Sequence, residues 1–176
     1  MGVERIPLVP IEEAERRERR AASPVPELWA VLDEVKDPEI PVISIWELGV
    51  LQDVAVEEGV IKVTITPTYS CCPAMSVMAE DVTSALNGAG YPNVEVVQRL
   101  SPAWSTSWIA ESAQEALRAY GIAPPGSGGG AQPEVIQCPH CGATEVRQVS
   151  EFGSTACKAL YQCVECLEPF DYFKPI

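Results

Sequence analysis

Two closely spaced cysteine pairs are the side chains of this sequence best suited to chemistry. They are Cys138-Pro-His-Cys141 and Cys163-Val-Glu-Cys166, with 21 residues between the pairs. A Cys-x-x-Cys turn directs two thiolates toward one point, and two such turns joined by a hairpin give the tetrahedral sulfur cage that zinc prefers. An iron–sulfur cluster also suits four thiolates, and two disulfides are the remaining alternative. Because a closed four-thiolate site is usually structural, the spacing predicts a zinc ribbon with a structural zinc ion.

Cys72 is the most interesting single residue. It ends an expected extended segment, and Pro73 after it suits the first position of a helix. A thiol there faces unpaired backbone amides and the positive end of the helix dipole, which should lower its pKa and favour a thiolate. Such a thiolate could react or bind metal; the alternative is a small buried side chain at a strand–helix junction. Cys71 is expected to point the other way, into the core.

Other candidate residues carry weaker signals. Asp37 and Glu39 flank a proline in a rigid turn, where they could hold a metal or a hydrogen-bonded loop. A helix-ending turn with solvated carboxylates is the favoured local interpretation. Cys157 lies between the two cysteine pairs on an expected loop, and the sequence does not decide between a spare thiol and a fifth functional sulfur. His140 could ligate, but four cysteines already complete a tetrahedral set.

Two tryptophans, Trp104 and Trp108, fall in a polar loop and at an expected helix start. Packing over the sheet edge is favoured over a place in an interface. The sequence has no Gly-x-Ser-x-Gly and no glycine-rich phosphate loop after a strand, which argues against hydrolase and nucleotide chemistry.

The elements that position these residues follow from hydrophobic periodicity. Residues 1–22 form a charged N-terminal extension, and 11–22 are expected to be a frayed or solvent-exposed helix, with docking to a partner as the alternative. A second helix should open at residues 23–26 and stop at the prolines near residue 38. From residue 50 the period changes to two, which predicts a hairpin turning at 57–59. Its buried face would carry Ile61, Val63 and Ile65.

The second half of this region continues the pattern. A helical run follows Pro73, with Met75, Met78, Val82, Ala85 and Leu86 on one face. A third strand is expected at 94–97, and a last helix capped by 105–107 and ending at Tyr120. The order helix, strand, strand, helix, strand, helix predicts a small α+β domain over 23–121. A Pro/Gly linker over 122–133 should separate it from the ribbon at 134–176.

Composition narrows the function. The 176 residues carry a net charge of −13, and both the ribbon and the α+β domain are acidic. An acidic ribbon repels phosphates, so nucleic-acid binding is not expected. No run of about 18 apolar residues is present, and the N-terminus does not read as a secretory signal, so no membrane span is expected. Seven cysteines without such a signal point to a reducing cytoplasm.

Three segments together carry a family resemblance: D-P-E-I-P-V-I-S-I-W-E-L-G (37–49), T-P-T-Y-S-C-C-P-A-M (66–75) and S-P-A-W-S-T-S-W-I (101–109). They resemble the domain shared by SufT-like and cytosolic iron–sulfur assembly factors. With the cysteine ribbon appended, residues 24–176 resemble the D component of the bacterial ring 1,2-phenylacetyl-CoA epoxidase system, the PaaD/PaaJ family. This chain has Cys71 where relatives commonly have glycine.

The resemblance implies a role in phenylacetate catabolism that is not enzymatic. Such a protein is an accessory maturation factor of a multicomponent monooxygenase, which helps to install the iron–sulfur centre of the reductase subunit. The resemblance places the reactive cysteine at Cys72 and the acidic turn at Asp37 and Glu39, so these residues would handle a transient iron–sulfur cluster. Expected partners are the reductase subunit and the iron–sulfur assembly machinery, and a homodimer is compatible with the sequence.

Two further hypotheses compete with this one. The protein could be a structural or docking subunit that joins the oxygenase through the ribbon and Trp104/Trp108. A thiol redox enzyme using Cys71 and Cys72 is the other, but vicinal cysteines make only a strained disulfide ring.

Overall fold

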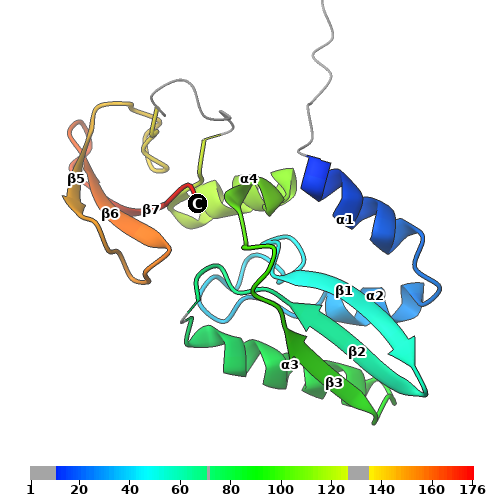
Figure 1. Ribbon diagram of the computed structural model, residues 1–176. Coiled ribbons are helices and arrows are strands. Elements are labelled where there is room, and N and C mark those ends of the chain that lie inside the picture. The colour runs from blue at the N-terminus through cyan, green and yellow to red at the C-terminus, as the bar shows by residue number, and fades with distance from the viewer. Residues whose placement is uncertain (1–10, 71, 127–134) are drawn as a thin grey trace, which may run out of the picture.

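The computed structural model describes residues 11–70, 72–126 and 135–176, apart from the side chains of residues 11 and 12. The chain is an α+β protein with a three-stranded sheet and a second, four-stranded sheet near its C-terminus (Figure 1). The fold class predicted from the sequence is therefore confirmed. Among the described helices, none has the length and apolar composition needed to cross a lipid bilayer.

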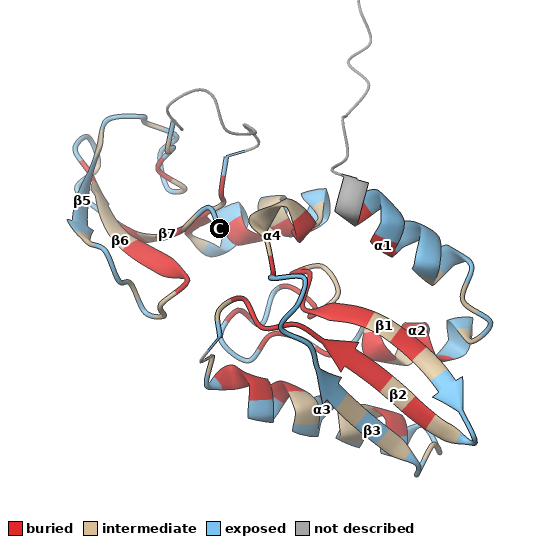
Figure 2. Cartoon of the chain, viewed as in Figure 1, coloured by how far each residue is buried: buried red, intermediate tan, exposed pale blue. Residues whose placement is uncertain are grey.

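The first sheet has the strand order β1 (Leu51–Glu57), β2 (Val60–Ile65), β3 (Val94–Gln98). β1 and β2 form the predicted antiparallel hairpin, and β2 pairs with β3 in parallel. The alternating residues Ile61, Val63 and Ile65 are buried, as their period of two predicts. Figure 2 shows this buried band along β1 and β2.

Two helices pack on this sheet. α2 (Pro26–Leu32) begins with proline at its first turn, and α3 (Ala74–Gly88) makes the crossover from β2 to β3. α3 buries one apolar stripe, whose members are Ala74, Met75, Met78, Val82 and Leu86. Because α3 directly follows Cys72 and Pro73, the packing of this stripe fixes the position of the cysteine at the N-terminal end of the helix.

The N-terminal helix α1 (Ile11–Ala21) is exposed over most of its described side chains, as its charge pattern predicts, but one of its faces is buried against the α+β domain. It contacts β1, and the Arg16 side chain is only 2% exposed. The guanidinium of Arg16 donates to the main-chain oxygens of Trp108 (3.0 Å), Trp46 (3.1 Å) and Leu51 (3.2 Å), and it pairs with Glu13. One cation thus satisfies three carbonyls, which gives the polar helix a buried anchor.

The last helix of the α+β domain begins later than predicted. The hydroxyl of Ser105 accepts a hydrogen bond from the amide of Ser107, but it caps only a short 3₁₀ turn, η1 (Thr106–Trp108). The α-helix itself, α4 (Glu111–Tyr120), starts after an extended pair and ends at Gly121, whose φ of 94° is left-handed. The capping serine therefore identified the right region of the chain, but the element that it caps is the short 3₁₀ turn and not α4.

The second sheet is the ribbon, with strand order β4 (Ile122–Ala123), β7 (Pro169–Phe173), β6 (Lys158–Cys163), β5 (Val146–Ser150). β4 pairs with β7 in parallel, so the chain enters the ribbon sheet directly after α4. The ribbon also contacts the α+β domain, because Cys157 and Phe173 belong to the core cluster of that domain. Of the linker predicted over 122–133, residues 122–123 form β4 and 127–133 lie outside the described residues. The two parts that it connects share a core.

Candidate functional site

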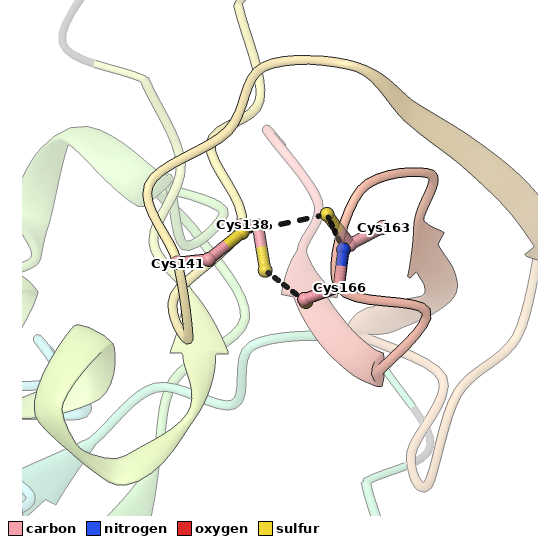
Figure 3. A group of neighbouring side chains, drawn as sticks. All are labelled: Cys138, Cys141, Cys163 and Cys166. Atoms are coloured by element: carbon pink, nitrogen blue, oxygen red, sulfur yellow. Dashed lines mark hydrogen bonds between the residues drawn. The ribbon is translucent and has the colours of Figure 1, made fainter.

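The four ribbon cysteines converge from two turns (Figure 3). In the first turn, the amide of Gly142 donates to the carbonyl of Cys138 at 2.9 Å, and Gly142 has a φ of +79°. In the second, which follows β6, the amide of Cys163 donates to the carbonyl of Glu168 at 3.0 Å. These tight turns hold the two thiols of each pair on the same side of the backbone.

The distances between the sulfurs fit a zinc ion. The Sγ atoms of Cys138 and Cys166 are 3.7 Å apart, and those of Cys141 and Cys163 are 3.6 Å apart. Four sulfurs at about 2.3 Å from a tetrahedral zinc lie about 3.8 Å from one another. All four ligand atoms lie within 4.8 Å of one another, so the donor set and its shape both suit zinc.

Cys72 lies at the junction that the sequence predicts, and it is half-buried. Its amide donates to the carbonyl of Tyr69 at 3.2 Å, which closes a turn directly before α3. Its sulfur receives hydrogen bonds from the backbone amide of Ala74 and from the phenol of Tyr69. One amide at the helix N-terminus, that of Ala74, therefore does point at the thiol.

The pKa of Cys72, however, moves in the opposite direction from the one expected. Burial raises the pKa of the Cys72 thiol above its ordinary value, and the nearby carboxylates of Glu39 and Asp37 raise it further. The hydrogen bonds from Ala74 and Tyr69 lower it, but they do not outweigh desolvation and the two negative charges. The prediction of a resting thiolate was wrong because neither the burial of the thiol nor the acidic turn beside it could be seen from local sequence alone.

The two carboxylates of the acidic turn, Asp37 and Glu39, have different roles. Asp37 is buried, with 4% of its surface exposed, and its Oδ1 accepts from the amides of Glu39 (2.9 Å) and Ile40 (2.7 Å). Burial raises the pKa of Asp37, although these two amides lower it. Glu39 is exposed, and the pKa of Glu39 is raised by partial desolvation and by the charge of Asp37. Asp37 therefore holds the turn together, and Glu39 is the more available carboxylate.

One small cavity brings these residues together. It is lined by Asp37, Glu39 and Cys72 from the α+β domain and by Cys157 and Phe173 from the ribbon. Cys157, whose role the sequence left open, is buried at this junction. The cavity therefore unites the three predicted cluster-handling residues with a thiol about 85 positions further along the chain.

Two nearby residues were missed by sequence reasoning. Tyr69 donates its phenol hydrogen bond to Cys72, and the pKa of Tyr69 is raised to about 12 by desolvation and by Cys72. Lys158, next to Cys157, is buried and pairs with Asp171 at 3.4 Å. The position of Tyr69 three residues before Cys72, in the segment 66–75, was the available signal for the first. Nothing local marked Lys158.

Other predicted residues lie elsewhere. Trp104 and Trp108 are both buried at 3% exposure, and the indole of Trp104 donates to the carbonyl of Leu48 at 3.1 Å. They are packing residues, as favoured, and the hypothesis of docking through them is wrong because they present almost no surface. His140 is exposed beside the first cysteine turn. Cys71 falls outside the described residues.

Comparisons with known proteins agree with this division of the chain. A model described as "Iron-sulfur cluster assembly protein" matches residues 26–98, and a model described as "PaaD zinc beta ribbon domain" matches residues 123–174. The second match begins at Ala123, the last residue of β4.

Two curated proteins and one of the solved structures that are similar to the chain illustrate this. The putative D component of 1,2-phenylacetyl-CoA epoxidase from Escherichia coli (strain K12) is 46% identical over 155 residues, covering 86% of this chain and 93% of that protein. "Fe-S protein maturation auxiliary factor" from Porphyromonas gingivalis (strain ATCC BAA-308 / W83) is 34% identical over 85 residues, covering 47% and 80%. The crystal structure of a DUF59 domain from Bacillus anthracis has a TM-score of 0.48 and 28% identity, covering 59% of this chain and 95% of that one.

Proposed function

The chain belongs to the PaaD family, the D components of 1,2-phenylacetyl-CoA epoxidase, and from this premise we propose that it is a maturation factor for the reductase component of that epoxidase. In this role it delivers an iron–sulfur cluster to the reductase and catalyses no step of the epoxidation. The match of residues 26–98 to an iron–sulfur assembly model supports the general role. That the reductase is the client is inferred from the family resemblance alone.

One observation carries the proposal: half-exposed Cys72 lines a cavity that Asp37 and Glu39 also line. A thiol and carboxylates at one place are suitable ligands for iron, and a partly open position lets cargo enter and leave. The four-sulfur ribbon is closed by comparison, because all of its ligand atoms are already within 4.8 Å of one another.

The raised pKa of Cys72 suits transfer better than a resting thiolate would. Iron must displace the proton of the thiol before the sulfur can bind it, so a thiol that holds its proton firmly binds iron weakly. When the client's thiolates take over the cluster, Cys72 regains a proton and the exchange is driven toward the client. The cluster keeps its electrons throughout, because one thiolate replaces another.

The ribbon has a separate task in this proposal. Cys138, Cys141, Cys163 and Cys166 would hold zinc, which supplies the folding energy of a domain with a small core of its own. The folded ribbon then keeps Phe173 and Cys157 against the α+β domain.

The test is the cluster content of the reductase. The reductase is produced with wild-type protein, Cys72→Ser, or the control Ser76→Ala, which changes an exposed residue in the first turn of α3. We expect several-fold less iron per flavin in reductase made with Cys72→Ser, and no change with Ser76→Ala. Equal iron content in all three samples would remove the proposal. Stoichiometric copurification with the oxygenase, indifferent to Cys72, would favour a docking role in its place.

A further inference from the structure

Cys157 is a ribbon residue whose side chain lies in the core of the other domain. It directly precedes β6, yet it clusters with the α+β core and not with the ribbon's own apolar group of Ala123, Ala159, Phe170 and Tyr172. It is also separate from the four-sulfur cage. The ribbon therefore carries a fifth thiol that zinc does not use and that points into the cavity of Cys72.

Hydrogen bonds from residues on both sides of Cys157 hold it in this position. The amide of Lys174 donates to the carbonyl of Cys157 at 3.0 Å, and the Thr155 hydroxyl is 3.0 Å from its sulfur. The amide of Lys158 donates to the carbonyl of Thr155 at 3.1 Å, which closes the turn before β6. A thiol fixed in this way is preorganised, so ordering it on binding costs little.

The cavity between the two thiols has the size of a single ion. Its volume is about 10 Å³, close to the smallest space that holds one water molecule. An assembled cluster contains at least two irons and two sulfides, so it needs the side chains around this space to open. A single metal ion fits without such opening.

The charges around the cavity favour a cation. Burial raises the pKa of the Cys157 thiol, and the charges of Glu39 and Cys72 raise it further, while Lys158 lowers it. The charges of Glu39 and Asp37 likewise raise the pKa of Cys72. These groups repel one another when ionised, and a cation among them would stabilise each one. Lys158 supplies the positive charge that acts on Cys157, and it is already paired with Asp171.

We propose that Cys72 and Cys157, with the carboxylate of Glu39, form a second metal site at the junction of the two domains, which binds one thiophilic divalent ion of the iron class. Two sulfurs are also the number that each iron of a two-iron cluster takes from protein. On binding, one ion replaces two thiol protons, which pass to solvent, and no electron moves. This inference rests on the proposed function, because it adds ligands for iron beside the cysteine that would hold the cluster.

The proposed junction site is more open than the ribbon cage. Among the described residues, the four ribbon cysteines are the group whose ligand atoms already lie within 4.8 Å of one another. Side chains of Cys72 and Glu39, both at least partly exposed, would move to complete it. A site that closes on its ion binds less tightly than a preformed one, which suits iron that must leave again.

Cobalt(II) tests the site directly, because its thiolate charge-transfer absorption grows with the number of sulfurs bound. The full chain is loaded with one zinc, kept free of oxygen and titrated with cobalt(II), while zinc release is monitored so that exchange at the ribbon is recognised. We expect one cobalt at saturation in the wild-type protein. Cys72→Ser and Cys157→Ser should each lose about half of the absorption and bind at least tenfold more weakly, and the double variant should show none.

Controls separate this site from its alternatives. Cys157→Ala is measured beside Cys157→Ser, and retained zinc and an unchanged melting temperature show that the ribbon still folds. Cys71→Ser should leave the titration unchanged. Loss of signal in Cys71→Ser with none in Cys157→Ser would move the second sulfur to the vicinal pair and overturn the proposal. Failure of the zinc-loaded wild type to bind cobalt would also overturn it, whereas the reductase assay would still judge the role of Cys72 by itself.

Discussion

Trp104 and Phe173 lie in contact across the junction of the two domains, with ring centroids 5.8 Å apart and planes inclined by 42°. Trp104 belongs to the loop before η1, and Phe173 ends the last strand of the ribbon. Phe173 also lines the cavity of Cys72 and Cys157. This aromatic pair therefore couples the position of the ribbon to the geometry of the candidate site.

Phe173→Ala should loosen that coupling. Truncating a buried phenylalanine costs about 3 to 5 kcal/mol of unfolding free energy, and Phe173 is 1% exposed. We expect a lower denaturation midpoint and faster alkylation of Cys157, detected by peptide mass spectrometry. Phe152→Ala, at a residue that is 60% exposed, is the matched control and should change neither quantity. An unchanged alkylation rate in Phe173→Ala would show that Phe173 does not seal the cavity.

Arg16→Ala should destabilise the protein far more than a surface charge change does. The variant leaves Glu13 buried without its closest partner and removes the hydrogen bonds to three carbonyls, a loss of about 3 to 5 kcal/mol. Arg17→Ala removes a bridge from a half-exposed arginine to the same Glu13, which keeps Arg16 as its partner, and should cost at most about 1 kcal/mol. Urea denaturation measures both. Equal losses would mean that α1 is held by its helix surface and not by Arg16.

Substitutions at Asp37 separate its hydrogen bonds from its charge. Asp37→Asn keeps an oxygen for the amides of Glu39 and Ile40 and avoids burying a charge, so we expect stability at neutral pH to be equal or higher. Asp37→Ala leaves two amides without an acceptor and should cost about 1 to 3 kcal/mol. Thermal unfolding at pH 7 compares the two variants. A large loss in Asp37→Asn would instead assign the carboxylate charge a stabilising role, through Lys158.

The pH dependence of Cys72 alkylation follows from its raised pKa. Only the thiolate reacts, so the rate should climb about tenfold per pH unit and reach its midpoint above 9.0, the ordinary value for a cysteine. Glu39→Gln removes a like charge and should move that midpoint to lower pH. Iodoacetamide labelling of the Cys72 peptide between pH 7 and 11 provides the curve. A midpoint below 9.0 in the wild type would restore the helix N-terminus as the dominant influence.

Zinc removal should release Cys157 before it disturbs the first sheet. Among the described residues, the ribbon's own buried cluster has six members, so we expect its fold to depend on metal. After chelation we expect Cys157 to become open to alkylation, while amides of β2 and α3 stay protected from hydrogen exchange. The zinc-loaded chain is the reference for both measurements. Persistent protection of Cys157 without zinc would show that the contacts of Phe173 and Lys174 suffice to hold it.

Local pattern predicted much of this molecule. The alternation at Ile61, Val63 and Ile65 gave the hairpin, because a period of two fits only a half-buried strand. The spacing of the cysteine pairs predicted the four-sulfur cage, because each Cys-x-x-Cys turn depends only on residues that are close in sequence. These features depend on neighbours within a few residues, which is the range that a single sequence reveals.

The features that escaped prediction depend on distant contacts. The buried Arg16 side chain donates a hydrogen bond to the carbonyl of Trp108, 92 residues away, and nothing in the sequence of a charged helix reveals that partner. The pKa of Cys72 was misjudged because its burial depends on tertiary contacts and because its carboxylate neighbours come from the turn at 37–39, more than 30 positions earlier. Cys157 could not be assigned for the same reason, since its neighbours in the cavity belong to another domain.

The shared core also sets an order of events during synthesis. Residues 28–122 supply most of the apolar cluster, but Cys157 and Phe173 leave the ribosome later than all of them. A nascent chain can therefore form the first sheet while the pocket around Cys72 still lacks one wall. The wall arrives only with the ribbon, and zinc supply to the ribbon would then decide when a newly made molecule becomes competent.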